Sequence, residues 1–270
     1  MQNSIRGRSL AFACVSNSED VLGNNLLRSP LLLDSQMRLH VERGAPSASR
    51  GYNKALDATE EDLVVFLHQD VFLPKGWDDL LRHRVKQVDD IDPDWALIGS
   101  FGIGAQDGFG YGPVWSTSLG HIVGRVPERP VVVQGFDELL FVLRRSSGLR
   151  FDENLAGFHF YGTDIVQTAA SRGLKSYAVS LPCVHNDKFK GELDDDYNKS
   201  YHYMRRKWRA RLPILTPTIK ITWHGLNIVR SRVRFARDRP FRQRISQPIE
   251  IDPRIYAARC SWNDVSPIES

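Results

Sequence analysis

The 270-residue sequence has few cysteines and lacks a long hydrophobic run. Its three cysteines, Cys14, Cys183 and Cys260, are odd in number and widely spaced, which argues against a disulfide framework and against a cysteine-based zinc site. No apolar stretch reaches the length of a membrane span, and the N-terminal residues turn polar before the core of a signal peptide is complete. These absences predict a cytoplasmic protein in a reducing compartment.

The composition is that of an ordinary globular protein. Hydrophobic residues make up 41% of the chain and charged residues 25%, which excludes the disordered, collagen-like and coiled-coil classes. The length suits one domain, or one domain with an appendage.

Basic residues are concentrated near the C-terminus. The segment 205–259 holds 15 Lys and Arg residues against three acidic residues, a net charge of +12, whereas the whole chain carries +4. We therefore predict a core over residues 1–200 and a basic, largely helical extension over residues 201–270. Such asymmetry predicts an attachment surface for a phosphate-rich partner. Because the sequence has no recognisable nucleic-acid-binding module, we do not expect nucleic acid to be that partner.

The extension mixes cations with bulky apolar side chains. This composition suits an interfacial helix on anionic lipid, which would place the protein peripherally at the inner face of the membrane. It equally suits a helix that packs on the core or on a second copy of the chain, with its basic face in solvent.

The N-terminal third alternates between strand and helix patterns. Apolar runs predict strands over 9–15, 37–41 and 62–67, and helical spacing predicts helices over 21–33 and 50–58. This order predicts an α/β fold with a mostly parallel central sheet and helices on its faces. Further along the chain, we predict strands over 95–99, 131–133 and 174–181, another apolar segment over 136–143, and a helix over 161–172.

Polar residues follow the predicted strands directly. Asp70 comes two residues after a buried strand, and ligands of open parallel sheets bind beyond the carboxyl ends of the strands. Its carboxylate could bind a divalent cation that holds a diphosphate, or it could cap the turn before Pro74. His185 closes a second strand and could join the same metal site or make a structural hydrogen bond. His68 is either a ligand or a side chain packed beneath the loop.

Asp164 lies at the start of a predicted helix. As a general base it would need an apolar setting, which Phe158, Phe160 and Tyr161 could supply. The alternative is that Asp164 interacts only with the helix dipole.

The glycine-rich stretch 102–108 is not a dinucleotide-binding fingerprint. Asp107 occupies the position of the third glycine, and the required strand-to-helix context is absent from the sequence pattern.

Six segments follow one another along the chain in a familiar order: 47–55, 61–71, 135–145, 149–153, 158–164 and 183–186. Together they resemble family 2-type glycosyltransferases, in the branch where the Asp-x-Asp motif reads His-Gln-Asp. The resemblance covers roughly residues 9–190 and implies a GT-A-type, Rossmann-like fold in which a nucleotide-sugar-binding half joins an acceptor half.

The resemblance also implies a role for individual residues. Asp70 would hold a divalent metal, Mn²⁺ or Mg²⁺, on the diphosphate of the donor, and His185 would be a further ligand of the metal or of the diphosphate. His68, at the position of the first Asp, is the third candidate metal ligand. Asp164 would deprotonate the acceptor hydroxyl. The residues placed near the nucleotide or the sugar are Ser16, Asn17, Glu42, Arg50, Asn53, Lys54, Gln69 and Glu138.

The sequence departs from the family pattern at three positions. His68 replaces the first Asp of Asp-x-Asp, and Thr163 replaces the Glu of the Glu-Asp pair. No acid is evident at the position that often contacts the nucleobase, and Glu42 is the nearest candidate. The metal site therefore has one carboxylate fewer than the family pattern.

The predicted function is transfer of a sugar from a nucleotide-sugar donor to a hydroxyl of a glycan or glycoconjugate, with metal assistance and inversion, as in polysaccharide biosynthesis. The altered motifs leave open a catalytically weakened nucleotide-sugar-binding or scaffold protein. The basic extension leaves open a nucleic-acid-binding protein.

Overall fold

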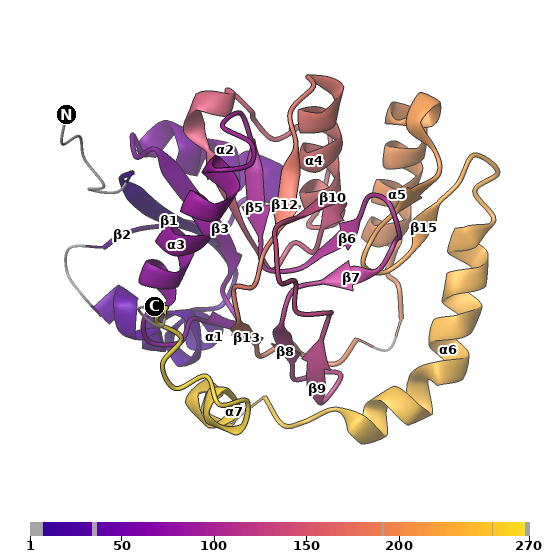
Figure 1. The fold of residues 1–270 in the computed structure, drawn as a ribbon. Helices are drawn as coiled ribbons and strands as arrows, with labels where there is room; N and C mark the ends of the chain where they lie inside the picture. The colour runs from indigo at the N-terminus through magenta and orange to yellow at the C-terminus, as the bar shows by residue number, and fades with distance from the viewer. Residues whose placement is uncertain (1–7, 34–36, 191, 250, 268–270) are drawn as a thin grey trace.

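The structure is a computed structural model that describes residues 8–33, 37–190, 192–249 and 251–267. A nine-stranded sheet forms its centre, with helices on both faces (Figure 1). The strands, in spatial order, are β2 (Arg38–Arg43), β1 (Leu10–Ser16), β3 (Leu63–His68), β11 (Leu140–Arg144), β5 (Leu97–Gly99), β12 (Ser176–Ala178), β10 (Val131–Phe136), β6 (Gly102–Gly104) and β7 (Gly110–Tyr111).

Most strands of this sheet run in the same direction. The pairing pattern orients β2, β1, β3, β5, β12 and β6 one way and β11, β10 and β7 the other way. This confirms the predicted α/β class with a mostly parallel central sheet.

The two faces of the sheet carry separate hydrophobic clusters. Along β3, Val64 and Phe66 point into one cluster, whereas Val65 and Leu67 point into the other, as the two-residue period of a strand requires. The first cluster is covered by α2 (Ala48–Ala58), α4 (Tyr161–Ser171) and α5 (Asp195–Lys207), and the second by α1 (Glu19–Asn24) and α3 (Trp77–Asp89).

A second, four-stranded sheet adjoins the first directly after β3. Its strands, in spatial order, are β4 (Val71–Phe72), β13 (Cys183–His185), β8 (Val114–Ser116) and β9 (His121–Val123). Only Gln69 and Asp70 separate β3 from β4, and the register of the second sheet pairs His185 with Val71. The junction between the two sheets therefore brings His185 next to Asp70.

The C-terminal segment continues from α5 and wraps around the core (Figure 1). Its elements are the short hairpin of β14 (Ile214–Leu215) and β15 (Lys220–Ile221), α6 (Asn227–Ile245) and α7 (Pro253–Arg259). Helix α5 spans residue 200, and its buried side chains, among them Tyr197 and Tyr201, belong to the first cluster. The division into two domains at residue 200 stays a prediction.

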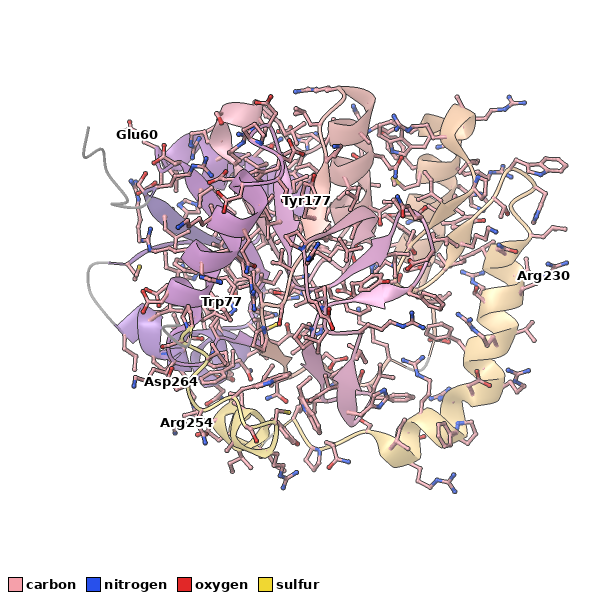
Figure 2. The ribbon with its side chains drawn as sticks, in the orientation of Figure 1. Glu60, Trp77, Tyr177, Arg230, Arg254 and Asp264 are labelled. Carbon is pink, nitrogen blue, oxygen red and sulfur yellow. The ribbon has the colours of Figure 1, made fainter. Side chains whose placement is uncertain are left out.

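Helix α6 is anchored mainly at its two ends. Near its start Ile228 and Ser231 are buried, whereas most of its other side chains, Arg230 among them, are exposed (Figure 2). Just after its end, Gln247 N donates to Thr117 O at 2.8 Å, and α7 then packs Tyr256 against the second sheet. No helix in the described ranges is long and apolar enough to cross a membrane.

Two sequence predictions differ from the structure, and one helix has no counterpart among the predictions. The helix predicted over 21–33 is α1 followed by two 3₁₀ turns, Leu26–Arg28 and Pro30–Leu33. Pro30 has no N–H, which disfavours an α-helix through residues 26–33. The strand predicted over 174–181 is reduced to β12, and residues 183–185 enter the second sheet instead. Helix α3 was not predicted. Two further 3₁₀ turns span Arg145–Ser147 and Arg209–Arg211.

Candidate active site

Three potential metal ligands meet at the junction of the two sheets. Asp70 Oδ1 lies 3.3 Å from His185 Nε2 and 3.9 Å from His68 Nδ1. One ligand atom from each residue lies within 4.8 Å of the others, which is close enough for all three to bind one cation. We call these residues the triad.

The donor set of the triad fits a divalent transition metal. A carboxylate and two imidazoles together suit Mn²⁺ or Zn²⁺ better than Mg²⁺, which prefers oxygen ligands. Asp70 Oδ1 is buried, and His185 Nε2, at 3.3 Å, lies near it at more than the ideal hydrogen-bond distance. A protonated His185 compensates the buried carboxylate in the absence of metal, and a divalent cation between the two side chains would take over that role.

The triad is electrostatically coupled. Burial disfavours the charged form of both partners, yet the Asp70 carboxylate raises the pKa of His185 to about 10, and His185 holds the pKa of Asp70 well below its usual range. Burial lowers the pKa of His68. The protein without metal therefore holds an Asp70–His185 ion pair beside a neutral His68.

Tyr161 orients His68 from the first turn of α4. Its hydroxyl lies 2.8 Å from His68 Nε2 and donates to the backbone oxygen of Glu138 at 3.1 Å. The hydroxyl has only one proton, which it donates to Glu138, so His68 Nε2 must be the donor in the contact with Tyr161. The Nδ1 atom of His68 is then unprotonated and faces Asp70. That tautomer leaves Nδ1 free for a metal.

Gln69 joins the carboxyl ends of β1 and β3. Its side-chain oxygen accepts hydrogen bonds from Ser16 Oγ at 2.7 Å and from the backbone N–H groups of Asn17 and Ser18, each at 3.1 Å, and its amide nitrogen donates to Asn17 Oδ1 at 2.6 Å. The structure thus brings together three of the residues predicted near the nucleotide. It also shows that Gln69 holds the loop in shape.

Asn53 faces the protein interior. Its side chain exchanges hydrogen bonds with the backbone of Phe151, each at 3.0 Å, and donates to Glu153 at 2.9 Å. All the hydrogen bonds of this side chain in the described structure therefore fix the loop before α4, and none is made toward the triad.

The other predicted nucleotide contacts lie on β2 and α2. Lys54 Nζ pairs with Glu42 Oε1 at 2.6 Å, and Arg50 is exposed near the start of α2. The Lys54 ammonium lowers the pKa of Glu42, so this carboxylate is charged and already paired.

Glu138 lies in the loop between β10 and β11. Burial, followed by the charge of Asp137, raises the pKa of Glu138 to about 8. Burial also raises the pKa of Asp137. Perturbed carboxyl groups of this kind gather at functional sites.

Asp164 is buried beneath α5, with only 2% of the residue exposed. Lys207 Nζ lies 2.8 Å from its carboxylate, and Trp208 Nε1 donates to Oδ1 at 2.7 Å. Burial raises the pKa of Asp164 against the opposing effect of Lys207. Asp164 does not line the pocket described below, and its role as a general base stays a prediction.

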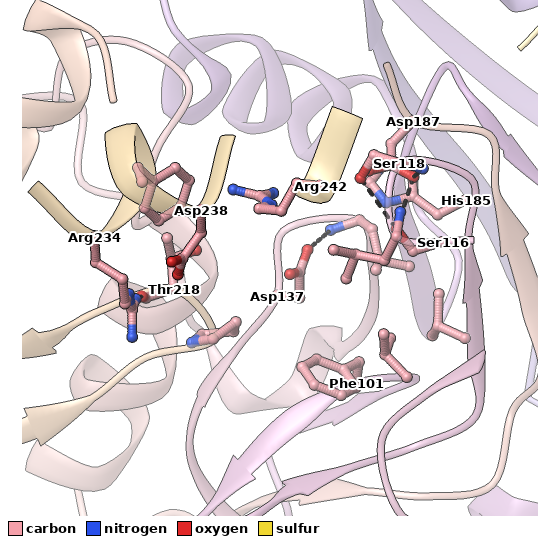
Figure 3. Close-up of a pocket in the computed structure, with 16 residues that line it drawn as sticks. Phe101, Ser116, Ser118, Asp137, His185, Asp187, Thr218, Arg234, Asp238 and Arg242 are labelled. Carbon is pink, nitrogen blue, oxygen red and sulfur yellow. Dashed lines mark hydrogen bonds between the residues drawn. The ribbon is translucent and has the colours of Figure 1, made fainter. Parts of the chain in front are cut away.

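An open pocket of about 520 Å³ borders the triad through His185 (Figure 3). One wall comes from the second sheet and the loop after β10, and the other comes from α6. Its polar and charged lining residues are Ser116, Ser118, Asp137, His185, Asp187, Thr218, Arg234, Asp238 and Arg242. The volume suits a small-molecule substrate.

That α6 lines this pocket could not be predicted, because no local pattern distinguishes one arginine of this basic segment from another. Asp187 could have been noticed, since it follows His185 by two residues. It accepts hydrogen bonds from Ser116 Oγ at 3.0 Å, from Ser118 N at 3.1 Å and from Ser118 Oγ. These bonds fix one end of the pocket wall.

Comparison with known proteins gives limited similarity. No protein-family model matches the chain. A curated protein of Fuscovulum blasticum, described as ATP synthase subunits region ORF 6, is 25% identical over 154 residues, which cover 56% of this chain and 61% of that protein. The similarity thus spans about three fifths of the length of that relative.

Solved structures are similar in outline only. A mannosyltransferase from Pyrobaculum calidifontis, solved with GDP-Man and Mn²⁺, has 12% identity and a TM-score of 0.47, covering 94% of this chain and 76% of that chain. Glucosyl-3-phosphoglycerate synthase from Mycobacterium tuberculosis has 16% identity and a TM-score of 0.44, covering 79% and 83%. These values establish no substrate for this chain.

Proposed function

We propose that the chain is a metal-assisted glycosyltransferase of the GT-A type that uses a nucleotide-sugar donor. The observation that carries this proposal is the triad, which lies at the carboxyl end of β3 and borders the pocket. The ordered motifs over residues 9–190 support it, and so does the mostly parallel sheet.

The residues of the triad would hold Mn²⁺, and they would hold Mg²⁺ less tightly because Mg²⁺ prefers oxygen ligands. Bound there, the cation would neutralise charge on a nucleoside diphosphate leaving group. The loop that Gln69 fixes to Ser16 and Asn17 would form the nucleotide side of the site.

In the proposed reaction the acceptor oxygen forms a bond to the anomeric carbon of the sugar. The bond from that carbon to the diphosphate oxygen breaks, the nucleoside diphosphate leaves with the electron pair, and a base takes the acceptor proton. Attack from the face opposite the leaving group gives inversion.

A second carboxylate competes with Asp164 for the role of base. Asp137 lines the pocket, and the hydrogen bond that its carboxylate accepts in the described structure, from Leu139 N to Oδ1 at 3.1 Å, leaves Oδ2 available. Asp164 would first have to release Lys207 and Trp208. We therefore propose Asp137 as the base and keep Asp164 as the alternative.

Thermal unfolding with a panel of nucleotides tests the proposal. We expect one of UDP, GDP, TDP and CDP to raise the melting temperature only when Mn²⁺ or Mg²⁺ is present, because a ligand that binds the folded state stabilises it. Asp70→Ala should abolish the shift. No shift with any nucleotide and metal would contradict the proposal.

A catalytically weakened nucleotide-sugar-binding or scaffold protein is the second candidate. The engagement of Asp164 by Lys207 and Trp208 favours it. Such a protein would show the nucleotide-dependent shift in melting temperature without metal-dependent cleavage of any donor.

The exposed apolar side chains of α6 and of the loop before it fit the predicted membrane contact. Trp223, Leu226, Val229 and Val233 are all more than half exposed, among arginines. We propose peripheral binding to anionic lipid, with contact to a second copy as the alternative. In a flotation assay, the wild-type chain should bind vesicles that contain phosphatidylglycerol, and the double variant Trp223→Ser/Val233→Ser should not. Equally strong binding of the wild type to neutral vesicles would contradict this proposal.

A further inference from the structure

The wall of the pocket formed by α6 carries two arginines from the C-terminal extension. Arg234 and Arg242 lie about two helical turns apart, and both line the pocket. In Figure 3 Arg242 lies between α6 and Asp137, whereas Arg234 lies near Thr218 at the far end from His185. The basic segment thus supplies cations to a pocket to which the core supplies carboxylates.

Neither guanidinium forms an ion pair in the part of the chain that the structure describes. The Arg234 guanidinium donates one hydrogen bond, from Nη2 to the backbone oxygen of Thr218 at 3.1 Å, and the Arg242 guanidinium has neither a hydrogen bond nor an ion pair there. Asp238 lies on α6 between them, but its carboxylate accepts from Arg237 at 2.8 Å. The two cations therefore have N–H groups available to a ligand.

The Arg242 side chain is held in place by aromatic rings. Its guanidinium carbon lies 4.6 Å from the ring centroid of Phe235 and 5.8 Å from that of Phe189. The residue is half-buried, and burial lowers its pKa. A half-buried guanidinium without acceptors is unfavourable, and an anion with several oxygen atoms would satisfy it.

The opposite wall of the pocket is acidic. Asp137 and Asp187 line it, and Asp187 is fixed by Ser116 and Ser118. Because carboxylates repel anions, a ligand with one anionic group would place that group at α6 and its neutral hydroxyls toward Asp137. This orientation puts a hydroxyl next to the proposed base.

We infer that α6 binds an anionic group, a phosphate or a carboxylate, on the acceptor, with Arg242 as the main contact and Arg234 as the second. The assignment of this ligand as the acceptor rests on the proposed function. The guanidinium fork matches both groups in bidentate geometry. The acceptor class is then a hydroxyl compound that carries a phosphate or a carboxylate.

Calorimetric titration of the full chain with inorganic phosphate, and separately with acetate, tests the anion site. Arg242→Gln should weaken phosphate binding on the order of ten-fold, because it removes charge-assisted hydrogen bonds. Arg242→Lys should restore only part of the affinity. The matched control is Arg239→Gln, which removes the same charge from an exposed position of α6 that lines no described pocket.

Phosphate binding that needs Arg242 but not Arg239 supports a phosphate-bearing acceptor, and acetate binding with the same pattern supports a carboxylate-bearing one. If the wild type binds neither anion, or if Arg239→Gln weakens binding as much as Arg242→Gln, the inference is overturned.

The melting-temperature shift with nucleotide and Mn²⁺ separates the acceptor from the donor. We expect Arg242→Gln to leave this shift unchanged. Loss of the shift would assign Arg242 to the donor diphosphate and overturn the acceptor assignment. If no nucleotide shifts the wild type while phosphate binding still needs Arg242, the proposed function fails and the anion site stands.

Discussion

Asp70 Oδ1 lies 3.3 Å from His185 Nε2, although the two residues are far apart in the sequence. Asp70 directly precedes β4, and His185 is the last residue of β13. The pairing of His185 with Val71 produces this contact, and the hydrogen bond from Asn186 N to Asp70 O at 2.8 Å extends it. The geometry of the triad thus depends on backbone pairing. It does not require a flexible loop to close.

The triad should bind Mn²⁺ through all three side chains. Asp70→Asn and His185→Gln should each lower Mn²⁺ affinity by at least about 100-fold, since removal of a direct ligand costs more than the loss of an outer-shell partner. Electron paramagnetic resonance of free Mn²⁺ measures this. The control is His121→Gln, an exposed histidine of β9. Unchanged Mn²⁺ affinity in the Asp70 and His185 variants would show that the metal does not bind at the triad.

Asp137→Asn and Asp164→Asn should separate the two candidate bases. We expect Asp137→Asn to slow sugar transfer by about 10²–10⁴-fold with little loss of stability. Asp164→Asn should instead lower the free energy of unfolding by about 1 kcal/mol, because the buried contacts from Lys207 and Trp208 are weakened while Lys207 keeps its pair with Asp152. Steady-state rates and chemical denaturation give the two readouts. If Asp164→Asn slows transfer and Asp137→Asn does not, Asp164 is the base.

Stability at low pH should depend on Asp152. Burial opposes its ionisation, but hydrogen bonds from Lys207 at 2.7 Å and Tyr203 at 2.5 Å lower the pKa of Asp152 to about 2. A depressed pKa in the folded state stabilises the protein above the ordinary value of 3.8, and this contribution is lost as the pH falls toward 2.

We therefore expect the wild type to lose about 2 kcal/mol more than Asp152→Asn between pH 6 and pH 2. Urea denaturation at both pH values measures the difference. Equal losses in the two proteins would show that Lys207 does not hold Asp152 in the folded state.

The end of α6 should detach when Gly120 is replaced. Gly120 has φ +70°, and a Cβ at this position would overlap the backbone oxygen of Ile245. Gly120→Ala should therefore speed tryptic cleavage after Arg242 and Arg244. Gly148→Ala is the control, because Gly148 has φ +63° but open space around it. Equal cleavage rates in both variants would show that backbone strain alone explains the effect.

Much of the α/β core could be predicted from the sequence, because β1, β3 and α4 have strong apolar periodicity. Asp70 and His185 could be placed at strand ends for the same reason. The second sheet could not be predicted, since its strands have only two or three residues and pair through register. The partners of Asp164, Lys207 and Trp208, lie at the end of α5, and no local sequence pattern relates them to Asp164.

The position of α6 at the pocket could not be predicted from the sequence for a different reason. Its apolar residues, among them Val229 and Val233, are exposed, so the hydrophobic pattern does not show which face meets the core. Only the anchoring of both ends of α6 turns Arg234 and Arg242 toward the pocket.

The most direct test of the central claim is the release of nucleoside diphosphate from a panel of UDP-, GDP-, TDP- and CDP-linked sugars with and without Mn²⁺. We predict that the wild-type chain releases the diphosphate from one of these donors only with metal, and that Asp70→Asn reduces the rate by about 100-fold or more. Release from none of the donors, or equal release by Asp70→Asn, would contradict a metal-assisted glycosyltransferase.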